Sequence, residues 1–295
     1  VVKHDGYGWG ARRLARELDD VVESYFVSDE DELADLRPAT PRTIRMLNEV
    51  RSGRLARVLD LGAIPAVATR AGLDEAAAEA ARRDGLTVRV GILDAAGWST
   101  IRPENAPEFA AAVAGSGLAV ELWTHVSSVE RARTILDGFL AAERTFTSAG
   151  VRVVSTDAAG TASASRGLTF DRLRIGVGLF GSRLGSSVDT HCAIRVRAPL
   201  VRRFEPGETA WAGYGETPIP KNGTVVVLRC GYGDGFPRAL AGSADILSVG
   251  MQYTTRLVRD GSDPTVLVGP DDDVDRLAAR AGLSAHELVV GLAPR

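Results

Sequence analysis

Lysine is the rarer basic residue of this chain, and one of its lysines occupies a position where it could do chemistry. Among 35 basic residues, only Lys3 and Lys221 are lysines. Lys3 ends a short β-branched run, and Tyr7 follows it in a glycine-rich loop. A lysine that loses solvation at a strand end can form a Schiff base, which an arginine cannot. On position alone a solvent-exposed lysine is the commoner explanation, but the isolation of Lys3 among arginines favours a chemical role.

A repeating pattern of strands and helices must position Lys3. Up to about residue 180, β-branched runs alternate with Ala/Glu/Arg-rich stretches whose apolar residues are spaced by three and four. Eight such strands predict an α/β fold, a (β/α)8 barrel with its helices outside, because parallel neighbours need helical crossovers. A doubly wound open sheet is the competing architecture. The predicted strands are 1–3, 24–27, 42–47, 64–69, 87–93, 119–125, 151–155 and 173–179, and the predicted helices are 10–18, 53–61, 73–83, 105–114 and 128–147.

The pattern changes in the last third of the chain. Helical spacing gives way to short β-prone runs separated by Pro-Gly, Asn-Gly and other glycine-rich turns. We therefore predict a barrel over residues 1–187 and a smaller, mainly β domain over 188–295. The abrupt β-branched start leads us to expect that the barrel is truncated at its N-terminus. The runs of the second domain are 193–197, 224–228, 246–249 and 265–268, followed by a helix at 275–281 and a last run at 288–292.

Composition narrows the possible partners. The 295 residues carry 35 basic and 38 acidic side chains, for a formal net charge of -3. A nearly neutral chain lacks the field that non-specific binding to nucleic acid or anionic membranes needs, so we expect neither partner. No apolar run approaches the roughly 20 residues of a membrane helix, and no signal peptide is evident. Two cysteines and four dispersed histidines predict neither a disulfide framework nor a metal site, and they suit a cytoplasmic protein.

A series of motifs occurs in a fixed order along nearly the whole chain. The first, VVKHDGYGWG over residues 1–10, places a tyrosine four residues after a strand-end lysine. Together the motifs resemble the alanine racemase family, which are pyridoxal-phosphate (PLP) enzymes of fold type III, and the chain is identified as a divergent member. The other matching segments are 123–125 (WTH), 174–181 (RIGVGLFG), 212–215 (AGYG), 231–238 (GYGDGFPR) and 250–251 (GM).

The resemblance implies a cofactor and two bases. In this family the lysine holds PLP as an imine and moves the substrate's α-proton on one face, so Lys3 takes both roles. A tyrosine from the β domain of the partner subunit acts on the opposite face, and Tyr214 matches it. We therefore expect a homodimer in which each site is completed by the partner's β domain. Because an unperturbed tyrosine has a pKa of about 10, a neighbouring cation or donor must stabilise its anion.

Arg174 carries the most diagnostic implication. Many PLP enzymes place a carboxylate beside the pyridine nitrogen, whereas an arginine there cannot give up its proton, so the nitrogen stays unprotonated. The carbanion is then less delocalised, which favours reprotonation over transamination. A salt bridge at the barrel mouth is the alternative role for Arg174. By resemblance, the other cofactor contacts are His125, which touches Arg174, and a phosphate-binding group of Tyr7, Gly176, Val177 and Thr161, where Thr161 replaces the family's serine.

The chain departs from the family pattern near the expected substrate. The family's buried lysine, which is often carbamylated, falls on Gly91, and the arginine that it braces falls on Trp98. Loss of only one member would strand a buried charge, so their joint loss indicates coordinated retuning. Two further departures are Gln252, in place of an acidic residue, and Pro294, in place of a tyrosine that touches phosphate. The predicted substrate contacts are Trp98, Tyr232 and Met251.

These residues predict an amino-acid racemase that interconverts L- and D-alanine, or a related small amino acid, by two-base proton transfer. One alternative is a PLP-binding regulatory relative that has lost turnover, which the departures at Gly91, Trp98 and Pro294 favour. Another is a different PLP reaction on the same fold, such as decarboxylation or aldol cleavage, which the pairing of Arg174 with Tyr214 disfavours.

Overall fold

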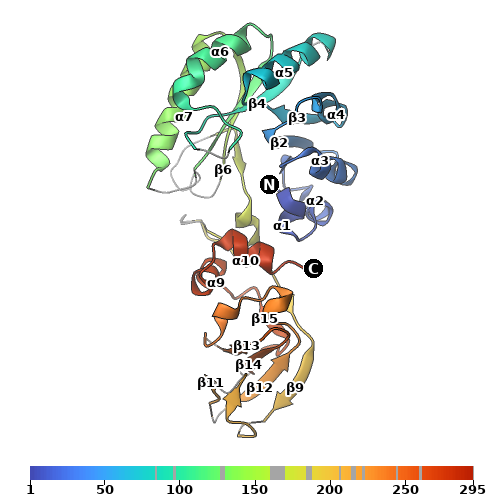
Figure 1. Ribbon diagram of the computed structural model, residues 1–295, viewed down its shortest axis with the longest axis vertical. Coiled ribbons are helices and arrows are strands. Elements are labelled where there is room, and N and C mark those ends of the chain that lie inside the picture. The colour runs from blue at the N-terminus through green and yellow to red at the C-terminus, as the bar shows by residue number, and fades with distance from the viewer. Residues whose placement is uncertain are drawn as a thin grey trace. The chain divides into compact units, whose positions relative to one another are not determined.

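The alternating strands and helices of the first part of the chain build a parallel barrel (Figure 1). In the computed structural model, seven described strands pair in parallel in their sequence order, β1 to β7, with helices outside them. This confirms the predicted α/β barrel class. The strands are β1 (Ser24–Val27), β2 (Thr43–Glu49), β3 (Ala63–Ala66), β4 (Thr87–Gly91), β5 (Ala119–His125), β6 (Arg152–Ala159) and β7 (Arg172–Arg174).

The helices of the barrel follow the predicted periodicity closely. A helix that we did not predict, α3, begins after Asp29, whose carboxylate accepts bonds from the amides of Asp31 and Glu32. The helices are α1 (Lys3–Tyr7), α2 (Ala11–Leu18), α3 (Glu30–Leu36), α4 (Leu55–Asp60), α5 (Arg70–Arg83), α6 (Ala106–Ala114) and α7 (Ala132–Ser148). The structure describes residues 1–83, 85–95, 98–126, 130–159, 170–183, 188–205, 207–213, 217–220, 223–243, 245–258 and 261–294.

Between β1 and β7, the first two residues nearly close the barrel. The amide of Val2 donates to the Phe26 carbonyl of β1 at 2.9 Å, and the Val1 amine donates to the Ile175 carbonyl, beyond β7, at 2.7 Å. The predicted strand 1–3 is therefore reduced to a two-residue bridge, because Lys3 already begins the turn α1. The predicted strand 173–179 is also shorter, since a 3-10 turn occupies Val177–Phe180.

Barrel strands alternate between two buried faces. In β5, Val120 and Leu122 pack into an apolar cluster with Phe139 and Phe146 of α7. Glu121 and Trp123, which alternate with them, lie on the other face, and Glu121 there bonds to Arg45 of β2. This period of two places apolar side chains under the helices and polar side chains inside the barrel.

The second part of the chain forms a separate, mainly β unit. The compact units are Val1–Gly176 with Gly185–Val188, and Val177–Leu184 with Asp189–Arg295. A four-stranded sheet in the order β13-β14-β12-β9 and two short pairs, β10-β11 and β15-β8, make up the second unit. Its strands are β8 (Val196–Arg197), β9 (Leu200–Phe204), β10 (Trp211–Ala212), β11 (Thr217–Pro218), β12 (Thr224–Leu228), β13 (Ile246–Val249), β14 (Thr254–Val258) and β15 (Val266–Val268).

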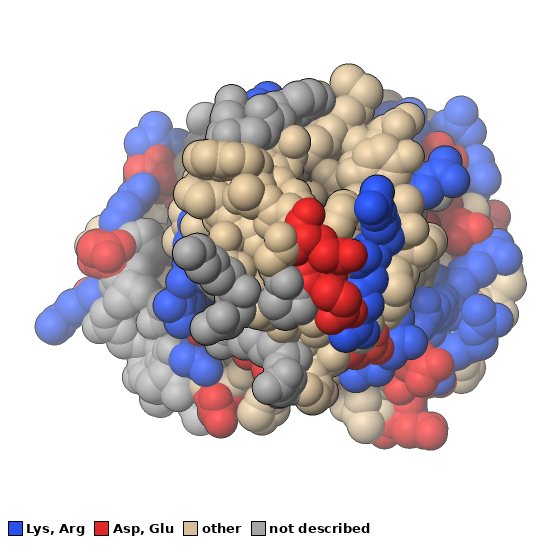
Figure 2. All heavy atoms as spheres, turned by 90° about the horizontal axis from the view of Figure 1, so that it is seen from below, with Lys and Arg blue, Asp and Glu red and all other residues tan. Residues whose placement is uncertain are grey.

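Two helices end the second unit, α9 (Val274–Ala281) and α10 (Ala285–Gly291). The last predicted run, 288–292, lies largely in α10, which Ser284 and Glu287 begin with a reciprocal capping box. In the described part of the chain, no helix combines the length and apolar character needed to cross a membrane. Figure 2 shows acidic and basic side chains interspersed on one face, as the small net charge leads one to expect.

Candidate active site

The carboxyl ends of three neighbouring strands bring His125 and Arg174 to one level. His125 pairs in register with Ala159, and Ala159 with Arg174, across β5, β6 and β7. Lys3 reaches the same edge, because Val2 bonds to Phe26 near the end of β1. Active sites of parallel barrels gather at this edge of the sheet. The structure therefore places Lys3, His125 and Arg174 on the expected side of the barrel.

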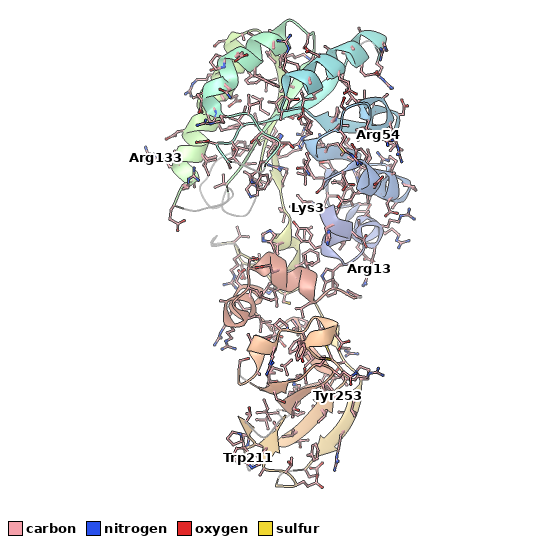
Figure 3. All side chains as sticks on the ribbon, viewed as in Figure 1. Lys3, Arg13, Arg54, Arg133, Trp211 and Tyr253 are labelled. Carbon is pink, nitrogen blue, oxygen red and sulfur yellow. The ribbon has the colours of Figure 1, made fainter. Side chains whose placement is uncertain are left out.

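Lys3 is half-buried and begins a single left-handed turn. Figure 3 labels Lys3 at α1, of which it is the first residue; it labels Arg133 on α7 and Arg54 at the residue before α4. The residues after Lys3 have positive φ angles, including 54° at His4 and 49° at Asp5. Non-glycine residues in this conformation cost about 1–3 kcal/mol each and concentrate at functional sites.

Two carboxylates hold this strained turn. Glu32 of α3 accepts bonds from the His4 amide and, at 2.7 Å, from the Ser28 amide. The Asp5 carboxylate accepts a bond of 2.7 Å from the Ala11 amide at the start of α2. The turn that carries Lys3 is thus tied to two helices.

Tyr7 and Gly176 meet at the end of the turn. A Cβ atom on Gly176 would lie 2.2 Å from the Tyr7 hydroxyl oxygen, so only glycine permits this approach. Tyr7 is buried, and desolvation raises its pKa to about 12, which keeps the hydroxyl protonated at neutral pH. The pair combines an uncharged donor with a backbone that has no side chain to obstruct a ligand.

Arg174 is buried and bound on two sides. Its Nε lies 2.5 Å from Asp157 Oδ1 in β6, and its Nη2 donates to the Thr124 carbonyl of β5 at 2.6 Å. Burial lowers the pKa of Arg174 to about 10; Asp157 opposes this shift and Arg89 adds to it. The guanidinium therefore stays charged at neutral pH.

Arg174 belongs to an arginine–carboxylate network that fills the barrel interior. Asp157 also binds Arg89 of β4 at 2.6 Å, and Glu121 of β5 binds Arg45 at 2.8 Å and Arg89 at 3.3 Å. Burial raises the pKa of Asp157, but Arg89 and Arg174 outweigh it and hold that pKa below its usual range. The network comprises Arg45, Arg89, Glu121, Asp157, Arg172 and Arg174.

Gly91 faces the ring of Trp123, its partner in register on β5. A Cβ atom at position 91 would lie 2.5 Å from two atoms of that ring and 2.6 Å from the Thr100 methyl group. Any longer side chain there would overlap the indole. At the position that falls on the family's lysine, the ring of Trp123 thus fills the space that a longer side chain would need.

Trp98 stacks on His125. The ring centroids are 4.5 Å apart with an interplanar angle of 32°, and Trp98 is 39% exposed. The residue that falls on the family's arginine thus lies beside a predicted site residue, at the carboxyl edge of β5. An aromatic surface stands where the resemblance leads one to expect a guanidinium.

Tyr232 and Met251 come together in the second unit. The Tyr232 amide bonds to the Gly250 carbonyl at 3.0 Å, and the Gly233 amide bonds to the Met251 carbonyl at 2.9 Å. Tyr232 and Met251 are exposed and line one pocket of about 610 Å³, together with Arg238, Gln252 and Tyr253. Their predicted role as substrate contacts stays a prediction.

Three further predicted site residues are Thr161, Tyr214 and Val177. Thr161 and Tyr214 lie outside the described residues. Val177 is buried and begins the 3-10 turn of the second unit.

The sequence reading missed the charged residues of the barrel interior, although a local signal was available. Arg45, Arg89 and Glu121 each stand singly between apolar residues, in Ile-Arg-Met, Val-Arg-Val and Val-Glu-Leu. On a strand buried on both faces, an isolated charge predicts an internal ion pair.

Known proteins resemble this chain over most of its length. A family model, alanine racemase, N-terminal domain, matches residues 1–184. An alanine racemase of Desulfovibrio desulfuricans is 28% identical, over 98% of this chain and 87% of that protein. The structure of alanine racemase from Acinetobacter baumannii has a TM-score of 0.77 at 18% identity and covers 100% of this chain and 89% of its own.

A second solved structure links the fold to a cofactor in another protein. Alanine racemase from Bartonella henselae, with covalently bound pyridoxal phosphate, has a TM-score of 0.73 at 17% identity and covers 99% of this chain and 89% of its own. These two structures bear on the fold, and the family model bears on ancestry. Because that model spans well over half of the 295 residues, the predicted relationship is confirmed and the chain belongs to the alanine racemase family.

Proposed function

We propose that this protein is a PLP-dependent amino-acid racemase that interconverts L- and D-alanine or a related small amino acid. The observation that carries the proposal is the meeting of Lys3, Tyr7 and Arg174 at the carboxyl edge of one barrel. Family membership supports the same reaction class. A cytoplasmic location remains part of the proposal.

The residues at this edge suit pyridoxal phosphate. Lys3 supplies the primary amine that a carbonyl cofactor requires. The close approach of Tyr7 to Gly176 places a hydroxyl group beside backbone without a side chain, a combination that suits a phosphate group. Arg174 supplies a charged donor that stays protonated. We assign Lys3, Tyr7, His125, Arg174 and Gly176 to the cofactor, with Val177 and Thr161 as further phosphate contacts from the sequence match.

Each residue then has a defined task. Pyridoxal phosphate, when bound, draws electrons from the substrate's α-carbon and so acidifies the proton there. The Lys3 Nζ takes or returns that proton on one face. Arg174 donates a hydrogen bond without surrendering its proton, which limits charge delocalisation and favours return of the proton to carbon.

Tyr214 is the proposed base on the opposite face. A two-base racemase needs its acid/base groups on opposite faces of the α-carbon, because a single base returns the proton to the side from which it came. We propose that the partner subunit supplies this tyrosine within a homodimer, with Tyr232 and Met251 nearby. The support for this assignment is the sequence match of residues 212–215.

Substitution of Lys3 tests the proposal directly. The wild-type protein, mixed with PLP and L-alanine or L-serine in deuterated water, should show absorbance of bound cofactor, exchange of the α-proton and formation of the D-isomer. Lys3→Ala should lose the absorbance and the racemisation. Racemisation that persists in Lys3→Ala would rule out this mechanism, and product analysis would reveal decarboxylation or aldol cleavage.

A second candidate is a relative that binds PLP without turning over. Two observations favour it: Trp123 excludes a side chain at Gly91, and Trp98 stacks on His125 where the family pattern has an arginine. This candidate predicts cofactor absorbance that amino acids do not perturb. Deuterium exchange at the α-carbon separates the two functions.

A further inference from the structure

Arg174 contacts the Asp157 carboxylate, the Trp123 ring and the Thr124 carbonyl. We propose that Asp157 and Trp123 are the positioning residues of Arg174, and that position 91 is glycine because only glycine admits Trp123 to this place. The inference deepens the proposed function and rests on it, since Arg174 is the residue assigned to the cofactor ring. The residues concerned, Gly91, Trp123 and Asp157, come from the neighbouring strands β4, β5 and β6.

Asp157 uses both carboxylate oxygens to fix two guanidinium groups. Its Oδ1 lies 2.5 Å from Arg174 Nε, and its Oδ2 lies 2.6 Å from Arg89 Nη2. Its side chain is fully buried. The Thr124 carbonyl holds a second nitrogen of Arg174 at 2.6 Å. The contact with Asp157 is an ion pair and the contact with Thr124 is a hydrogen bond, and together they restrain the position of the guanidinium group.

Trp123 supports the same guanidinium through its ring face. The Arg174 guanidinium carbon lies 4.5 Å from the ring centroid, and that of Arg89 lies 5.5 Å from it. Trp123 is fully buried. A cation over a desolvated indole is attracted by the ring, so Trp123 restrains both arginines from a second direction.

Gly91 makes this position of Trp123 possible. A Cβ atom at position 91 would lie 2.5 Å from ring atoms Cε2 and Cζ2. The ring cannot retreat freely, because it is enclosed by the barrel. Even the single methyl group of alanine must therefore displace the indole from the arginines.

Charge makes Asp157 more than a packing residue. Arg174 faces Asp157 on β6 and Arg89 on β4, Arg172 lies on its own strand, and Lys3 lies at the same edge. Burial and Arg89 both weaken the hold of Arg174 on its proton, and Asp157 opposes them. Without the carboxylate, two buried guanidinium groups would face each other, so Arg174 would move and release its proton at lower pH.

The first experiment compares Asp157→Asn with Glu30→Gln. Glu30 of α3 is also a buried carboxylate, and it pairs with the exposed Arg51. The dissociation constant of PLP and the pH titration of its bound absorbance are measured for each variant. Asp157→Asn should bind PLP about tenfold more weakly, and its alkaline limit of binding should move to lower pH. Glu30→Gln should match the wild type within about twofold.

The second experiment is a double-mutant cycle that does not depend on Asp157. Gly91→Ala should weaken PLP binding about tenfold in the wild type, because the methyl displaces Trp123. In a Trp123→Leu background, where the indole is absent, the same change should alter binding by less than about twofold. If Asp157→Asn does not fold, this cycle decides the inference.

The outcomes separate the inference from the proposed function. Failure of the wild type to bind PLP at Lys3 would overturn both. A wild type that binds PLP, together with a folded Asp157→Asn that keeps its affinity and alkaline limit, would overturn the inference alone. An equal effect of Gly91→Ala in both backgrounds would do the same.

Discussion

The two faces of the barrel strand β5 are both buried and chemically opposite. On β5, Leu122 packs in the apolar shell under the helices, while its neighbour Glu121 binds Arg45 and Arg89 inside the barrel. Apolar burial yields about 25 cal/mol per Å² removed from water. Burying ions costs several kcal/mol each before their attraction is counted. The apolar shell therefore accounts for the stability of the barrel, and the buried charges of the interior must have a role other than stability.

The position of the network supplies that explanation. It runs from Arg45 on β2 to Arg174 on β7, and Arg174 lies at the edge that holds Lys3. Each guanidinium is fixed by a carboxylate that another guanidinium also uses. Stability alone would favour an apolar filling of the same volume, so we infer that the interior is built to orient Arg174. The shell and the interior should then respond differently to substitution.

The largest effect is expected from Glu121→Gln. Glu121 is the shared partner of Arg45, Arg89 and Arg172, so its loss leaves three guanidinium groups without their common counter-charge. We expect the free energy of unfolding of the cofactor-free protein to fall by about 3–5 kcal/mol. PLP affinity should fall as well, because Arg89 would lose one of the two carboxylates that position it beside Arg174. Urea denaturation and absorbance titration measure the two quantities.

Leu122→Ala is the matched change on the shell side of the same strand. Leu122 is fully buried, and truncation leaves a cavity that should cost about 2–5 kcal/mol. In the protein that remains folded, PLP affinity should equal that of the wild type. If Leu122→Ala weakened PLP binding as much as Glu121→Gln, the two faces would not have separate roles.

The sequence predicts the shell far better than the interior. β-branched runs identified the barrel strands 24–27 and 119–125 at the bounds observed, and apolar residues spaced by three and four identified the helix 105–114 to within one residue. The strand predicted at 1–3 failed because α1 has left-handed geometry, which depends on bonds from His4 and Ser28 to the distant Glu32. β14 was not predicted, because its sequence does not alternate between apolar and polar residues. Its pairing with β12 and β13 holds it in the sheet.

Residues of the candidate site could be predicted where the residue type alone indicates a chemical role. Lys3 stood out by its rarity, and Arg174 by its motif. The role of Asp157 was hidden, because its two partners lie 68 and 17 residues away on other strands. From the sequence, Gly91 indicated only that the family's lysine is absent. The structure shows that the ring of Trp123, on the next strand, fills the space of that side chain.

Acidic pH should reduce the stability deficit of a variant of the barrel interior but not that of a variant of the shell. The pKa of Asp157 lies below its ordinary value, so its carboxylate contributes stability fully above a pH of about 4 and loses it as pH falls through the folded-state pKa. At pH 7, Asp157→Asn should be less stable than the wild type, and this deficit should shrink below pH of about 4. Leu122→Ala has no titrating group at the changed site, so its deficit should persist. Urea denaturation across pH 3 to 7 makes the comparison, and a constant Asp157→Asn deficit would contradict it.

The smallest expected effects come from removing one hydroxyl group at the mouth or in the shell. Tyr25 belongs to the shell, where its hydroxyl donates to the Ala15 carbonyl at 3.0 Å. Tyr25→Phe should therefore cost about 1 kcal/mol of unfolding free energy and leave PLP affinity unchanged. Tyr7 lies at the mouth beside Gly176, and its raised pKa keeps it a donor.

Tyr7→Phe, in contrast, should change PLP affinity. Loss of one donor to the cofactor phosphate should weaken PLP binding about tenfold, which is roughly 1.4 kcal/mol. PLP affinity is the quantity that should separate the two variants, because Tyr25→Phe leaves it unchanged. Since each change removes one oxygen from a buried tyrosine, the two variants differ only in location. If both lowered stability equally and neither altered PLP affinity, Tyr7 would belong to the shell and the phosphate would have to be held elsewhere.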